Sequence, residues 1–107
     1  MKGYIERLQD AIRRMHGCTA GHVAKSPVTE LFKGKIVWQG EVEVFVLHGH
    51  PTAQRCYAWA YQDDEGKEHY TAVLEIPPVN SPRTAVQAAL AAKQKERTNE
   101  ETQGGTT

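Results

Sequence analysis

The sequence predicts an α+β protein: a three-stranded antiparallel β-meander with two helices on one face, in the order α-β-β-β-α, followed by a disordered C-terminal tail. Residues 4–16 carry apolar side chains at helical spacing. Residues 35–48 alternate between apolar and polar side chains, as in a half-buried strand. Residues 98–107 contain no apolar side chain that a core could bury.

The length of 107 residues supports one domain, expected to span residues 1–97, with residues 98–107 as the tail. The 13 basic and 13 acidic residues cancel overall but not locally. Seven cations and three anions give residues 1–38 a charge of +4, and two cations and seven anions give residues 39–80 a charge of −5. Overall neutrality argues against a generic polyanion binder and leaves room for a local basic face around the first helix.

Cysteine content and hydropathy indicate the compartment. Cys18 and Cys56 are too few for a disulfide framework, and neither a leader segment nor an apolar run of membrane-spanning length is visible. We therefore expect a cytoplasmic protein with reduced thiols, no cofactor and no membrane partner.

The helical pattern of residues 4–16 ends at Gly17, which adopts a left-handed conformation at little cost. Residues 18–32 are predicted to form a loop, because Gly21, Ser26 and Pro27 interrupt any regular pattern, with a short extended piece at residues 28–32.

Three strands are predicted, at residues 35–48, 55–61 and 69–76, with turns at residues 48–52 and 63–66. Short polar connections favour two successive hairpins. A second helix is predicted to start at Ser81 and Pro82 and to end near Lys95, because serine caps a helix and proline suits its first turn. With both helices on one face, the other face of the sheet would stay open.

This element order, with glycine and histidine in the turn after the first strand, resembles the double-stranded-RNA-binding domain over residues 4–95. The segment SPRTAVQAAL at residues 81–90 is similar to the last helix of that family. The resemblance implies that His50 lies in a loop that enters a minor groove and that Arg83 contacts phosphate. The family's lysine-rich helix start is reduced here to one cation.

Five residues, His16, Cys18, His22, His48 and His50, carry the side chains that zinc prefers. Their spacing matches no specific zinc signature, so no metal site is predicted. His48 and His50 remain candidates for contact with an anion, because a turn presents them to solvent.

The strand at residues 55–61 places Arg55, Tyr57, Trp59 and Tyr61 on one face and small residues on the other. The favoured interpretation buries the aromatic side chains in the core. The alternative displays them as a stacking platform or dimer interface. Periodicity alone cannot choose between the two faces.

No catalytic motif is recognisable, and the acidic residues gather in an exposed turn where a carboxylate keeps its ordinary pKa. The sequence therefore predicts a small non-catalytic binding module, a bacterial-type accessory protein that uses the open sheet face to bind a protein or a second copy of itself. The alternatives are a nucleic-acid-binding domain that uses Arg83, and a metal-dependent enzyme built on the histidines.

Overall fold

The computed structural model describes residues 2–105, with side chains described up to Lys93. Its elements follow the order α1 (Tyr4–His16), β1 (Thr19–Phe32), β2 (Lys35–His48), β3 (Arg55–Gln62), β4 (Glu68–Leu74) and α2 (Pro82–Gly105). The strands form one antiparallel sheet in the order β1-β2-β3-β4. The α+β class and the meander are confirmed, but the sheet has four strands where the sequence predicted three.

The additional strand, β1, occupies the segment predicted to be a loop. It pairs with β2 along its whole length, from Thr19↔His48 to Phe32↔Lys35. Pro27 is tolerated because β1 is an edge strand and because Glu41, its partner, directs its backbone groups away from β1. Tertiary pairing with a strongly predicted strand thus overrides the local signals that favour a loop.

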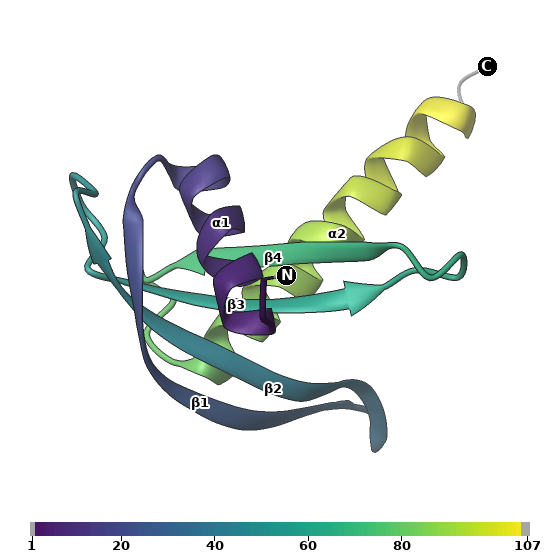
Figure 1. Cartoon of the computed structure of the whole chain (residues 1–107). Coiled ribbons are helices and arrows are strands. Elements are labelled where there is room, and N and C mark those ends of the chain that lie inside the picture. Colours follow the sequence, from purple (N-terminus) through teal and green to yellow (C-terminus); the bar gives the residue numbers. More distant parts are fainter. Residues whose placement is uncertain (1, 106–107) are drawn as a thin grey trace.

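The two helices lie on opposite faces of the sheet, which corrects the prediction that both cover one face (Figure 1). α1 packs Leu8 and Ile12 against a cluster that includes Phe45, Leu47 and Cys56, here called the α1-side core. α2 packs against a second cluster, here called the α2-side core, whose buried residues are Val28, Val42, Val44, Tyr57, Trp59, Val79, Ala85 and Val86. The expected open sheet face is therefore covered.

The register explains the error. Phe45 pairs with Cys56, and Cys56 pairs with Leu74, so these three side chains share the α1 face. Alternation within each strand cannot show this, because it carries no information about how neighbouring strands align.

The end of α1 and the start of α2 follow the predicted chemistry. Gly17 ends α1 with a φ of 69°, and its N–H donates to Arg13 O. At the start of α2, Ser81 Oγ accepts from the Thr84 N–H at 3.2 Å. α2 extends to Gly105, past the predicted end near Lys95, and residues 106–107 of the predicted tail lie outside the described residues. The division into a domain and a disordered tail stays a prediction.

Among the described residues, no helix is both long enough and apolar enough to cross a bilayer.

Candidate functional site

Two of the predicted aromatic site residues belong to the α2-side core. Tyr57 is 3% exposed and Trp59 is 4% exposed, both beneath α2. Tyr61 and Arg55, at the two ends of β3, are exposed. The favoured interpretation, in which the aromatic side chains are buried, is confirmed for Tyr57 and Trp59, and a stacking platform across the strand does not form.

The predicted turn histidines lie at the end of β2. His48 is exposed, and Gly49 turns the chain with a φ of 92°. His50 Nδ1 accepts hydrogen bonds from the N–H groups of Thr52 at 3.2 Å and Ala53 at 2.9 Å. His50 therefore fixes the β2–β3 turn, which leaves this nitrogen without a role toward a ligand.

The remaining histidines and Cys18 lie apart from one another. His16 Nε2 lies 3.0 Å from Ala72 O on β4, and His22 Nε2 lies 2.8 Å from Glu43 Oε1. Cys18 is buried in the α1-side core. In the part of the chain that the structure describes, no three His, Cys, Asp or Glu side chains are grouped to hold a metal ion.

The cations expected to contact nucleic acid are divided between the two helices. Arg13 and Arg14 are exposed on α1, and Arg83 is on α2, across the sheet. Arg83 Nη1 lies 3.3 Å from Glu30 Oε2, so this guanidinium is paired with a carboxylate. These cations do not form one continuous basic surface.

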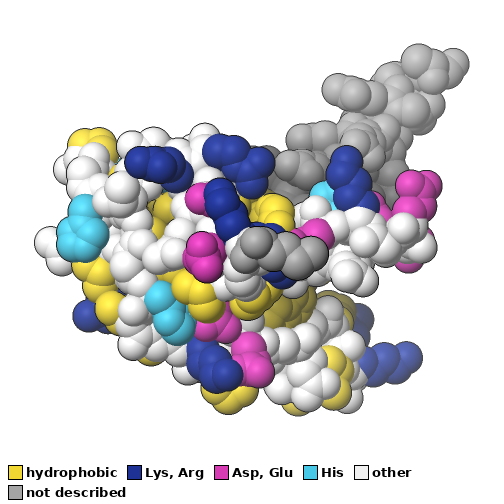
Figure 2. All heavy atoms as spheres, in the orientation of Figure 1, with side chains coloured by type: hydrophobic (Ala, Val, Ile, Leu, Met, Phe, Trp, Pro, Cys, Tyr) yellow, Lys and Arg dark blue, Asp and Glu magenta, His cyan; other side chains and the backbone are white. Residues whose placement is uncertain are grey.

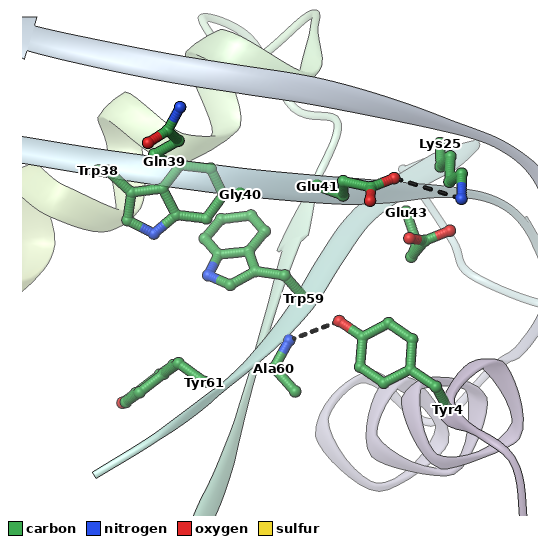
Figure 3. A pocket seen from close by; sticks show the side chains of 10 residues that line it. All are labelled: Tyr4, Lys25, Trp38, Gln39, Gly40, Glu41, Glu43, Trp59, Ala60 and Tyr61. Atoms are coloured by element: carbon green, nitrogen blue, oxygen red, sulfur yellow. Dashed lines mark hydrogen bonds and ion pairs between the residues drawn. The ribbon is translucent and has the colours of Figure 1, made fainter. Parts of the chain in front are cut away.

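A cleft opens where β2 and β3 separate (Figure 3). The ladder between the two strands runs only from Val46↔Arg55 to Glu43↔Ala58, although both strands continue past that point. The cleft has a volume of about 490 Å³. Its lining residues come from α1, β1, β2 and β3: Tyr4, Lys25, Trp38, Gln39, Gly40, Glu41, Glu43, Trp59, Ala60 and Tyr61.

Two tryptophans form the aromatic wall of the cleft. The Trp38 and Trp59 rings meet edge to face, with centroids 5.4 Å apart and an interplanar angle of 66°. Gly40 makes room for the Trp38 indole, because an added Cβ would lie 3.1 Å from Trp38 Cη2. This glycine, within β2, therefore shapes the aromatic wall.

Carboxylates and backbone groups supply the polar part of the cleft. Glu41 Oε2 lies 3.3 Å from Lys25 Nζ at the rim. Glu43 is only 4% exposed and is paired with His22 behind the cleft. Since backbone groups alternate along an antiparallel strand and Glu43 pairs with β3, the N–H and C=O groups of Gln39 and Glu41 also face the cleft.

Tyr4 closes one end of the cleft. Its hydroxyl accepts a hydrogen bond from the Ala60 N–H at 3.0 Å, which satisfies a backbone donor that β2 no longer reaches. Burial is the main cause that raises the pKa of Tyr4 above 10.0. Tyr4 therefore stays neutral and holds α1 against the separated strand.

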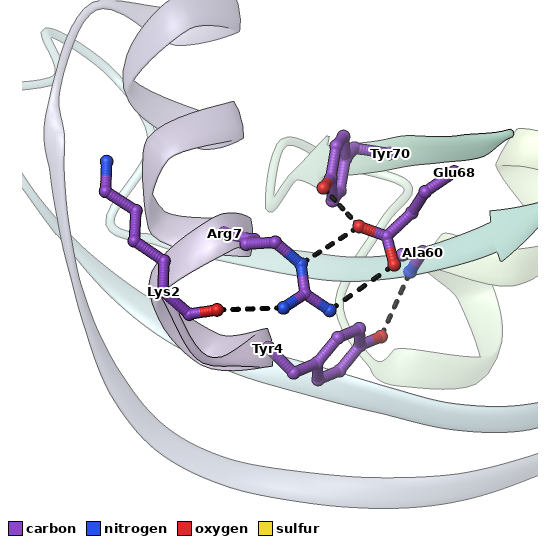
Figure 4. A network of polar contacts seen from close by, with 6 residues as sticks. All are labelled: Lys2, Tyr4, Arg7, Ala60, Glu68 and Tyr70. Atoms are coloured by element: carbon purple, nitrogen blue, oxygen red, sulfur yellow. Dashed lines mark hydrogen bonds and ion pairs between the residues drawn. The ribbon is translucent and has the colours of Figure 1, made fainter.

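A polar network beside Tyr4 ties α1 to β4 (Figure 4). Arg7 Nε donates to Glu68 Oε1 at 3.0 Å, and the Tyr70 hydroxyl donates to the same oxygen. The Tyr70 hydrogen bond, followed by that of Arg7, lowers the pKa of Glu68. The ionised Glu68 thus fixes the position of the helix that carries Tyr4.

A second, larger groove, of about 710 Å³, follows β4 and the alanine-rich face of α2. It shares Trp38, Trp59 and Tyr61 with the cleft. Lys93 Nζ lies 5.4 Å from the Tyr61 ring centroid, and His69 stacks on that ring at 5.3 Å. We regard the cleft as the stronger candidate site, because it combines the tryptophans with charged and polar side chains, whereas the groove is lined mostly by apolar residues.

The sequence pattern identified Trp59 and Tyr61 but missed the remaining cleft residues. Gly40 within a strand and Glu43 among apolar neighbours were the available signals. Tyr4 and Lys25 reach the cleft from elements whose packing no local pattern predicts.

Comparison with protein-family models, curated proteins and solved structures found no match.

Proposed function

We propose that this chain is a non-catalytic binding module, a bacterial-type accessory protein of the cytoplasm, that captures an extended peptide segment bearing a basic side chain. The observation that carries the proposal is the cleft itself, where the open edge of β2 lies beside two tryptophans and two glutamates.

Backbone recognition comes from the edge of β2. Gln39 and Glu41 present N–H and C=O groups at the spacing of a strand, beyond the last pair with β3. An extended segment placed there continues the antiparallel pairing, so its main chain supplies affinity and its alternate side chains supply specificity.

Side-chain recognition favours a cation. Tryptophan rings attract ammonium and guanidinium groups, and Glu41 supplies a carboxylate at the rim. The Glu41 and Lys25 side chains are more than half exposed, so their ion pair is weak and an incoming cation can replace Lys25. A volume of about 490 Å³ is ordinary for a small-ligand site.

The other interpretations have less support. A dimer through an open sheet face lacks its premise, because α2 covers that face. Nucleic-acid binding relied on cations that lie on opposite sides of the sheet. A metal-dependent enzyme relied on histidines that, within the described residues, do not converge. The two cysteines are free and buried, which fits a reducing compartment.

Intrinsic fluorescence offers a direct test, because both tryptophans of the protein line the cleft. We expect a β-forming heptapeptide with a central lysine to change the fluorescence at lower concentration than versions with a central alanine or glutamate. N-methylation of alternate backbone nitrogens in the lysine peptide should weaken binding, because it removes the strand pairing.

The matched variants are Glu41→Gln in the cleft and Glu65→Gln in the exposed β3–β4 turn. Only Glu41→Gln should weaken binding of the lysine peptide. Equal binding of the lysine and glutamate peptides, or no effect of N-methylation, would contradict the proposal.

A further inference from the structure

The outer end of the β1–β2 hairpin is a two-stranded arm. β2 pairs with β3 only from Glu43 onward, whereas β1 and β2 stay paired to Phe32↔Lys35. Figure 1 shows the two strands curving away from β3 toward their turn. Arg83 and Gln87 hold Glu30, and Trp59 contacts Trp38, so the arm is anchored at its base.

The tip of this arm, residues 31–37, exposes large apolar side chains. Leu31 is 56% exposed, Phe32 63%, Ile36 58% and Val37 47%. They make up four of the nine exposed large hydrophobic residues among those described, although the tip is only seven residues long. Such clustering marks a contact surface.

The tip is apolar on both sides of the arm. Successive side chains of a strand point to opposite faces, so Leu31 and Phe32 point apart. Leu31 pairs with Ile36 and shares its face, whereas Phe32 pairs with Lys35 on the other face. A flat dimer interface would cover one face and leave the other in water. A medium that surrounds the tip covers both.

The tip is also cationic. Lys33 lies in the turn and Lys35 directly follows it, and residues 31–37 contain no acidic residue. The nearest carboxylates along the chain, Glu30 and Glu41, are already paired with Arg83 and Lys25. Figure 2 shows dark-blue and yellow side chains together at the lower right, where Figure 1 places this turn.

We propose that the β1–β2 tip is a membrane-docking element that inserts its apolar side chains into a bilayer with anionic headgroups. Leu31 and Ile36 lie within about three residues of the apex of the turn, at roughly 3.3 Å per residue. Insertion of the tip to a depth of about 10 Å therefore buries both side chains, and this depth is typical of interfacial insertion. Lysine side chains extend toward headgroup phosphates while their stems stay in apolar surroundings.

Lys33 Nζ lies 5.4 Å from the Phe32 ring centroid, so the tip holds a cation directly beside an exposed apolar ring. The expectation of no membrane partner rested on the lack of a spanning segment, which interfacial docking does not require. This proposal concerns a different surface from the β2–β3 cleft and does not depend on peptide binding.

Co-sedimentation with vesicles tests the proposal on the full-length protein. We expect binding to phosphatidylcholine vesicles that contain phosphatidylserine, weaker binding at higher salt, and little binding to phosphatidylcholine alone. The double variant Phe32→Ser/Ile36→Ser should lose binding. Replacement of Lys33 and Lys35 by glutamine should lower the partition coefficient roughly fivefold per lysine.

Two matched controls separate the tip from general surface effects. Val23 is also 56% exposed but lies away from the tip, and Lys67 lies in the β3–β4 turn. Val23→Ser and Lys67→Gln should keep binding at the wild-type level. Absence of vesicle binding by the wild type, or equal losses in the controls, would overturn the proposal. A fall in apparent mass of the Phe32→Ser/Ile36→Ser variant without vesicle binding by the wild type would instead assign the tip to self-association.

Discussion

At the scale of single residues, Tyr57 combines a buried ring with a hydroxyl group that reaches the edge of the core. Its ring is buried in the α2-side core, and its hydroxyl donates a hydrogen bond to Glu75, which is partly exposed. Burial, followed by the hydrogen bond to Glu75, raises the pKa of Tyr57 to about 12. Folding therefore holds a proton on Tyr57 that the unfolded chain releases at lower pH.

The raised pKa of Tyr57 predicts that the free energy of unfolding falls at alkaline pH. Below pH 10.0 both states keep the proton and Tyr57 has no effect on the pH dependence. Above it only the unfolded state ionises, so the free energy of unfolding falls until the folded pKa is reached. We expect the free energy of unfolding, measured in urea, to fall between about pH 9 and about pH 11. The fall should be larger by about 1 kcal/mol in the wild type than in Tyr57→Phe.

The comparison of the wild type with Tyr57→Phe also controls for the ionisation of Cys56. Burial also raises the pKa of Cys56 to about 12, but both proteins share that thiol, so its contribution cancels in the difference. Parallel losses in wild type and Tyr57→Phe would show that the folded tyrosine ionises at an ordinary pKa.

Glu68 predicts the opposite pH dependence. Hydrogen bonds from Tyr70 and Arg7 lower its folded pKa below 4.5, so its stabilising effect is complete above that pH. The effect is lost as the pH falls through the folded pKa. The melting temperature of the wild type should exceed that of Glu68→Gln at neutral pH, and the gap should close in acid. Glu65→Gln, in the exposed turn, should match the wild type throughout.

At the scale of elements, the predictions succeeded where a local pattern determines the structure. The predicted bounds of the first helix and of the strand at 35–48 agree with α1 and β2. β1 was missed because its glycine, serine and proline weaken the local signal, and only pairing with β2 makes the segment extended. The cleft was missed for a related reason, since it exists where two strands part.

The β1–β2 turn gives a prediction at this scale. Lys33 and Gly34 both have positive φ, 52° and 78°, as a two-residue hairpin turn of type I′ requires. Gly34→Ala should lower the free energy of unfolding by about 1 kcal/mol, because a side chain disfavours this backbone conformation. A clash is not the cause, since nothing lies within 4 Å of the added Cβ.

Two further variants, Lys33→Asn and Gly21→Ala, test whether the positive φ of the turn causes the change in stability. Lys33→Asn should raise the free energy of unfolding by roughly 0.5 kcal/mol, because asparagine tolerates positive φ. Gly21→Ala lies in the same strand pair without a positive φ, and its Cβ would be 3.9 Å from His48 Nε2, an ordinary contact. If Gly21→Ala costs as much as Gly34→Ala, the turn conformation is not the source of the loss.

At the scale of the whole molecule, one sheet carries two cores. β2 sends Phe45 and Leu47 toward α1 and Val42 and Val44 toward α2, and β3 alternates in the same way. The sequence pattern located these apolar positions but not the helix above each, because the relative register of the strands decides that. Along β2 and β3, neighbouring buried residues belong to opposite cores. Loss of packing in one core should therefore disturb the other core through the backbone that they share.

We therefore predict that the two cores unfold in a single transition. Phe45 is fully buried on the α1 side, and Phe45→Ala should lower the free energy of unfolding by roughly 3–5 kcal/mol. Both tryptophans belong to the α2 side, where they report on the core that the mutation does not touch. In urea, tryptophan fluorescence and far-ultraviolet circular dichroism of Phe45→Ala should shift to the same lower midpoint. Phe32→Ala, which removes an exposed ring of the same size, should leave both midpoints near the wild-type value. A fluorescence midpoint that stays at the wild-type value in Phe45→Ala would mean that α2 and its core fold independently of α1.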